Sequence, residues 1–174
     1  MLLIWILLLV LPTNESGLLT RSRELFFNFN DEKCAPEKLF DLLEKTTIDD
    51  PVLLAYKGSA RASSAECAFM PNTKLKRFNE GKTLLNKAIE LDKANAEIRF
   101  LRLSIQANAP GFLGYNENIS EDKNIVLGAL AKNHLIWNDN TFTLQVISFL
   151  QENVDLTEKE SVLLQQLIFK LKNQ

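Results

Sequence analysis

Apolar and polar residues follow a helical spacing along most of the chain. Apolar positions recur at intervals of three and four, as one helix face requires, most clearly at Leu84, Leu85, Ala88, Ile89 and Leu91. No segment alternates apolar and polar residues like a strand, and no Asn-Gly or Asp-Gly hairpin turn occurs. We therefore predict an all-α fold of stacked antiparallel helical hairpins, or a compact irregular helical bundle. The expected helices cover residues 19–30, 36–45, 51–69, 72–92, 95–108, 120–133, 139–153 and 157–172.

Helix-start signals support these ranges. Pro36 and Pro51 suit a first helical turn, and Asp50 is a natural N-cap for the helix that begins at Pro51. Thr157 and Glu160 have the spacing of a capping box. The helix after this box has apolar residues along one face, at Leu164, Leu167, Ile168 and Leu171.

Residues 81–105 predict a helix, a tight turn and a second helix. The apolar pattern breaks at residues 92–94, and Asn95 can cap a helix that has Glu97 in its first turn. In that second helix Ile98, Leu101 and Ile105 are expected to face inward.

This segment, with Glu90-Leu91-Asp92 at its hinge, resembles the junction between two tetratricopeptide repeats. The resemblance covers residues 81–105 and implies stacked helical hairpins that bind a protein or peptide. Lys93 stands where that family usually has a proline. The stretch 56–62 is expected to lie too far upstream to partner the helix at 72–92 in a unit of about 34 residues.

Three glycines, Gly58, Gly81 and Gly128, fall inside predicted helices, where each costs about 1 kcal/mol relative to alanine. Another interaction should offset that loss of stability. Because the helix at 51–69 is also rich in alanine and serine, we expect its backbone to approach a neighbouring helix closely at Gly58. Access for a ligand is the alternative reason for such small residues.

The first eleven residues are almost wholly apolar and are closed by Pro12. Such a run suits a signal peptide and is shorter than the ~20 residues of a membrane-spanning helix. We expect residues 1–16 to be a signal peptide and residues 17–174 a single helical domain, exported to the periplasm or secreted. The alternatives for this segment are an uncleaved membrane anchor and the start of the folded domain. Contact with a membrane is expected only if this N-terminal segment stays uncleaved.

Cys34 and Cys67 are the only cysteines. In an exported protein they can close a disulfide, which would stabilise the fold by roughly 3 to 4 kcal/mol in the chain-entropy model. The alternative is two small buried thiols.

The composition of the chain and its motifs limit the kinds of functional site that it can form. Charged residues make up 24% of the chain and the formal net charge is −2, so nucleic acid is not an expected partner. His134 is the only histidine, which disfavours a metal site built from several histidines, and no metal or cofactor is expected. No nucleotide-binding, hydrolase-elbow or zinc-protease motif occurs. His134 could act as a base toward a cysteine or simply favour the C-terminus of a helix.

Five residues are candidates for binding. Arg99 and Arg102 share a helix face, with Arg61 expected nearby in space, and could hold an anion; alternatively, they lie on a solvated face with local ion pairs to Glu97. The loop at 110–115 carries Phe112 and Tyr115 between glycines, and these aromatics either close the end of the helical stack or contact a partner. Trp137 likewise either closes the end of the helical stack or contacts a partner.

The function that these observations favour is an exported, non-catalytic module that binds a protein or peptide on a helical surface. The alternative is a helical enzyme or small-ligand carrier with a pocket between helices. A structural subunit of an envelope assembly is a third possibility.

Overall fold

The computed structural model describes residues 15–29, 34–132 and 139–173, and in this part of the chain it confirms the all-α prediction, with no strand. The α-helices are α1 (Glu15–Phe27), α2 (Ala35–Glu44), α3 (Pro51–Ser63), α4 (Pro71–Leu91), α5 (Ala96–Asn108), α6 (Ile119–Ala131), α7 (Asn140–Asn153) and α8 (Glu158–Lys172). Two short 3-10 helices, η1 (Ser64–Cys67) and η2 (Gly111–Leu113), follow α3 and α5.

The predicted caps form. The Asp50 side chain accepts a hydrogen bond from the Val52 amide, and the Asn95 side chain accepts from the amides of Glu97 and Ile98. Thr157 and Glu160 form a complete capping box at the start of α8. These bonds satisfy backbone donors that have no partner within the helix, and they fix where α3, α5 and α8 begin.

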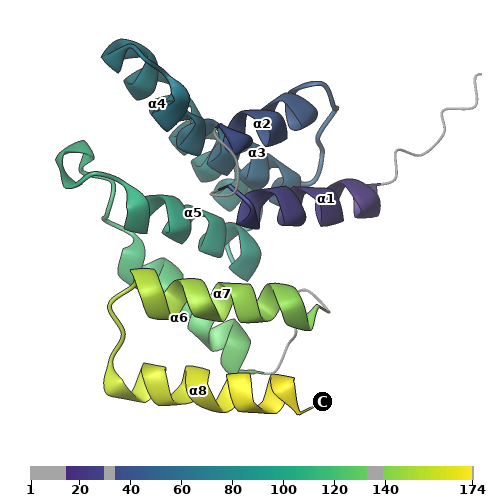
Figure 1. Ribbon diagram of the computed structural model, residues 1–174, viewed down its shortest axis with the longest axis vertical. Coiled ribbons are helices and arrows are strands. Elements are labelled where there is room, and N and C mark those ends of the chain that lie inside the picture. Colours follow the sequence, from purple (N-terminus) through teal and green to yellow (C-terminus); the bar gives the residue numbers. More distant parts are fainter. Residues whose placement is uncertain (1–14, 30–33, 133–138, 174) are drawn as a thin grey trace, which may run out of the picture.

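The helices form a stack in which α1 to α4 occupy one end and α6 to α8 the other (Figure 1). Helix α5 lies between the two groups and packs on α3, α6 and α7. Helices α7 and α8 run antiparallel at the lower end of the view, joined by a short connection. Ile98, Leu101 and Ile105 of α5 are buried as predicted, because this helix is covered on several sides.

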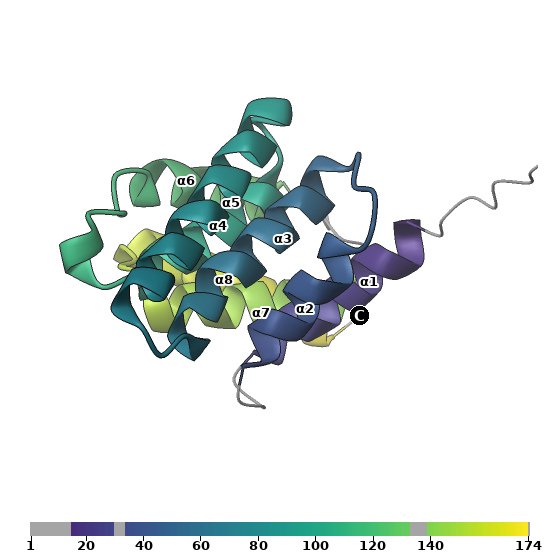
Figure 2. The same ribbon diagram turned by 90° about the horizontal axis from the view of Figure 1, so that it is seen from above.

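Helices α3 and α4 lie side by side (Figure 2) and pack more extensively than any other pair in the described chain. A Cβ atom built on Gly81 would lie 2.4 Å from the Ala62 nitrogen and 2.5 Å from the Gly58 oxygen. On Gly58 it would lie 2.9 Å from the Leu85 nitrogen. The close approach predicted for Gly58 is confirmed, and Gly81 is its counterpart on α4.

This pairing corrects one expectation. The stretch 56–62 is not too far upstream to partner the helix at 72–92: the chain reverses at residues 68–70, and the continuous α4 brings Gly81 back to Ala62. Close packing does not explain the glycine at position 128 of α6, because a Cβ atom built there would meet nothing within 4 Å.

Two further details differ from the sequence prediction. The helix expected at 51–69 ends at Ser63 and tightens into η1, where the Ser64 hydroxyl donates to the Arg61 carbonyl. Leu91, assigned to the apolar face of α4, is exposed at the last residue of the helix, whereas Leu85, Ala88 and Ile89 are buried.

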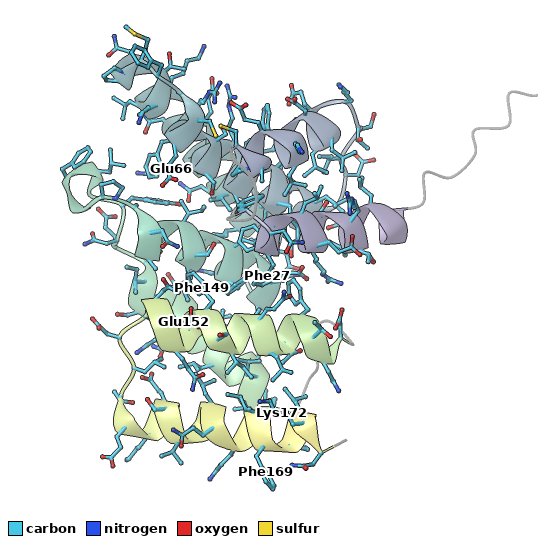
Figure 3. The ribbon with its side chains drawn as sticks, in the orientation of Figure 1. Phe27, Glu66, Phe149, Glu152, Phe169 and Lys172 are labelled. Carbon is cyan, nitrogen blue, oxygen red and sulfur yellow. The ribbon has the colours of Figure 1, made fainter. Side chains whose placement is uncertain are left out.

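An aromatic cluster joins the two ends of the stack. Phe100 of α5 stacks on Phe27 of α1 and meets Phe149 of α7 edge to face, with ring centroids 6.0 and 5.5 Å apart. Figure 3 shows Phe27 and Phe149 directed into the space between α1, α5 and α7. Each such pair adds about 0.5 to 1.5 kcal/mol beyond area burial, so the cluster helps to hold α7 on the first group of helices.

The expected signal peptide lies largely outside the described residues, and the boundary after residue 16 falls in the first turn of α1. Among the described helices, none combines the length and apolar character that a membrane span requires.

Candidate functional site

A cavity of about 450 Å³ lies between α5, α6 and the α7–α8 connection. The C-terminal end of α5 contributes Gln106 and Ala109, and the loop that follows contributes Tyr115. Helix α6 contributes Lys123 and the connection contributes Asp155. The volume is within the usual range of small-molecule and cofactor sites, about 300 to 1,000 Å³.

Two buried polar side chains in this cavity have no hydrogen-bond partner among the described residues. Both the nitrogen and the oxygen of the Gln106 amide are unpaired, although the residue is only 3% exposed. The Tyr115 hydroxyl is also buried and unpaired. Leaving such a group unsatisfied costs about 1 to 3 kcal/mol. These atoms are themselves covered, so a ligand in the cavity would pair with them only after the Gln106 or Tyr115 side chain turns toward it. The cavity bordered by these two side chains is the strongest candidate site in the described chain.

Tyr115 is held firmly in place. Its ring meets Phe78 of α4 edge to face at 5.6 Å, and the Lys82 ammonium lies 4.8 Å from the ring centroid. Burial raises its pKa to about 12, and the Arg102 charge opposes that rise. Tyr115 is therefore a neutral hydroxyl at physiological pH and can both donate and accept a hydrogen bond.

Phe112 and Tyr115, expected to behave alike, have different environments. Phe112 is 88% exposed in η2, so the explanation in which it tucks beneath the loop is wrong for this residue. Leu113 does pack against the core, as that explanation required. Gly114 turns the chain with a φ of 57°, a conformation that glycine adopts readily. This turn separates the exposed Phe112 from the buried Tyr115.

Arg99 and Arg102 are buried and form an ion cluster with α6. Arg102 Nε lies 2.6 Å from Asp122 Oδ2, and Arg99 Nη1 lies 2.9 Å from Asp122 Oδ1. Arg99 also pairs with Glu121 and donates to the Lys93 carbonyl. The expectation of a solvated face with ion pairs to Glu97 is therefore wrong, because α6 covers this face. The arginines already hold carboxylates, which argues against a further anion.

Glu97 takes part in a second buried cluster, which joins three helices. It accepts two hydrogen bonds from Arg23 of α1, at 2.8 and 2.7 Å, and one from the Tyr56 hydroxyl of α3 at 2.7 Å. Burial, followed by the Glu97 charge, raises the pKa of Tyr56 well above 10. Arg61 lies elsewhere, paired with Glu80 at 2.6 Å.

The two cysteines come together although they are far apart in sequence. Cys34 precedes α2, Cys67 ends η1, and both are free and partly exposed. The two sulfur atoms and a Glu37 carboxylate oxygen all lie within 4.8 Å of one another. Arg77 binds that carboxylate and the Ser64 carbonyl.

The sequence pointed to part of the cavity but not to Gln106. Tyr115 lines the cavity and Phe112 lies in the loop that forms one wall, whereas Trp137 and His134 lie outside the described residues. Gln106 was not anticipated, because a glutamine near the end of an amphipathic helix normally faces solvent. Asp122 was not anticipated either, because an aspartate in the first turn of a helix normally faces solvent.

Comparison of the chain with models of known protein families, with curated proteins and with solved structures gave no match.

Proposed function

We propose that this protein is a non-catalytic binding module that recognises a peptide segment of a partner protein at the cavity and at Phe112. The observation that carries the proposal is the Gln106 side chain, which borders the cavity and whose two buried amide atoms are both unpaired. A group that lowers stability by remaining unpaired is typical of a site whose ligand supplies the missing bonds.

The chemistry of the unpaired groups favours a neutral ligand. Lys123, which lines the cavity, already binds Glu160 and the Asp155 carbonyl, each at 3.0 Å. Both unpaired groups, the Gln106 amide and the Tyr115 hydroxyl, are uncharged. The other polar residues of the lining include one carboxylate, Asp155. A glutamine side chain has the same donor and acceptor as a peptide bond, so it can form two hydrogen bonds with a peptide backbone.

Phe112 supplies the apolar contact that a peptide partner needs. It follows Gly111, which lines the cavity, and is almost fully exposed. An exposed aromatic ring gives a large contact area at low entropic cost, and such residues often dominate binding energy. Backbone recognition inside the cavity and a side-chain contact at Phe112 would act together.

A binding role fits these groups better than catalysis. With a pKa of about 12, the Tyr115 hydroxyl keeps its proton at neutral pH and is a poor general base. The carboxylate of Asp122, the nearest buried acid, is engaged by two arginines. Neither Tyr115 nor Asp122 is therefore poised to move a proton.

The volume of the cavity supports a second candidate, a carrier of a small neutral polar molecule. The two functions differ at Phe112. A peptide would depend on this residue, whereas a small molecule enclosed in the cavity would not.

Peptides selected from a displayed random library against the full chain provide the test. We expect Phe112→Ser to weaken their binding at least tenfold, about 1.4 kcal/mol, while changing the free energy of unfolding by no more than about 0.5 kcal/mol. Phe169→Ser is the matched control, because Phe169 is 73% exposed and points away from the stack on α8 (Figure 3). Equal binding by the Phe112 and Phe169 variants would favour the carrier function.

Gln106→Met tests the cavity itself. The substitution keeps the length of the side chain and removes its polar atoms, so it should stabilise the fold by about 1 to 2 kcal/mol while weakening peptide binding. Loss of stability, with binding unchanged, would mean that the Gln106 amide has a structural role and would contradict the proposal.

Export remains part of the proposal, supported by the apolar run at residues 2–11. Mass spectrometry of the N-terminus should find a mature chain that begins near Gly17. Recovery of intact Met1 from a cytosolic fraction would contradict export without affecting the binding proposal.

A further inference from the structure

We propose that Cys34 and Cys67 are a redox-modification site, which closes into a disulfide by exchange with a low-molecular-weight disulfide. This inference is independent of the proposed binding site, which is formed by α5, α6 and the α7–α8 connection and shares no residue with the cysteine pair.

Three features of the structure support the formation of a disulfide between these two residues. The sulfur atoms lie within 4.8 Å of each other, although the residues belong to segments separated by α2 and α3. Cys34 is the described non-glycine residue with a positive φ, 62°, an uncommon conformation for a residue with a side chain. Both residues are partly exposed, so a small disulfide can reach them.

The thiol environment supports contact between the two sulfurs. Burial raises the pKa of the Cys67 thiol to about 12, and a hydrogen bond with Cys34 adds to the effect. Cys67 therefore keeps its proton in the reduced chain.

The exchange balances in two steps. The Cys34 thiolate attacks the external disulfide, forms a mixed disulfide and releases one external thiolate. Cys67 then loses its proton to solvent and attacks the Cys34 sulfur, which releases the second thiolate. The chain loses two electrons and two protons, and the external disulfide becomes two thiols.

A metal ion is the competing occupant, because Glu37 completes a group of three potential ligands. Its carboxylate is already bound by the Arg77 guanidinium. A divalent cation would have to displace that charge or lie beside it, and both are unfavourable. The arrangement therefore favours the disulfide.

The test incubates the full-length chain with mixtures of oxidised and reduced glutathione, followed by alkylation and mass spectrometry. We expect a monomer that has lost two hydrogens and has no alkylated cysteine. Because the chain has only two cysteines, an intramolecular disulfide can only join Cys34 to Cys67. The oxidised chain should melt roughly 7 to 15 °C higher than the reduced chain, as a disulfide closing a loop of this length predicts.

The Cys34→Ser/Cys67→Ser double variant is the control and should show no oxidant-dependent change in melting temperature. Two glutathione adducts per chain, disulfide-linked dimers or two persistently free thiols would each overturn the proposal. A stoichiometric complex of the reduced chain with Zn²⁺ that resists oxidation by glutathione would assign the group to a metal and would also overturn it.

Discussion

Gly81→Ala is the most informative single test of the packing of α3 on α4. Alanine is favoured over glycine by about 1 kcal/mol in an unconstrained helix. At Gly81, however, the new methyl group would lie 2.4 Å from the Ala62 nitrogen and 2.5 Å from the Gly58 oxygen. Both are backbone atoms and cannot rotate away, so the two helices must separate. Overpacking of this kind costs about 1 to 3 kcal/mol, so after the gain of about 1 kcal/mol in helix preference we expect a net loss of up to about 2 kcal/mol.

Gly128→Ala is the matched control within the same chain. Gly128 also lies inside a helix, but a Cβ there meets nothing within 4 Å, so this variant should gain about 0.4 to 1 kcal/mol. Urea unfolding followed by far-ultraviolet circular dichroism measures both changes as shifts in midpoint at constant slope. If both alanine variants gain stability equally, the close approach of α3 and α4 is wrong. Gly58→Leu extends the test and should also lose about 1 to 3 kcal/mol or more.

Other expectations concern buried polar groups and a cap. Asp122→Asn should lower the free energy of unfolding by about 3 kcal/mol or more, because it leaves two buried arginines without their shared carboxylate; an unchanged urea midpoint would contradict the ion cluster. Thr157→Ala should cost about 1 kcal/mol by removing the capping box of α8, and Thr157→Ser should restore most of it. Burial raises the pKa of Tyr115 to about 12 and that of Tyr56 well above 10, so absorbance should show no tyrosine ionisation near pH 10 while the fold persists. The stability that each raised pKa contributes is complete below pH 10. For Tyr115 it is lost as the pH rises through about 12, and for Tyr56 as the pH rises through that residue's own raised pKa.

The sequence alone was sufficient to predict the all-α class and the positions of the helices, because those depend on local features. Periodicity places an apolar face on each helix, and capping residues such as Asp50 and Asn95 specify where helices start. The close approach at Gly58 was predictable for a related reason, since small residues within one helix allow short distances to a neighbour.

Only the tertiary structure decided which helix faces are covered, and the candidate site depends on that. Asp122 and Gln106 are polar residues that any local pattern assigns to solvent, yet packing of α5 against α6 buries both. Phe112 and Tyr115 lie in one short loop and have opposite exposure, because Gly114 turns the chain between them. The proximity of Cys34 and Cys67 likewise depends on how α2 docks beside η1. Burial results from contacts between segments distant in sequence, and no local periodicity encodes those contacts.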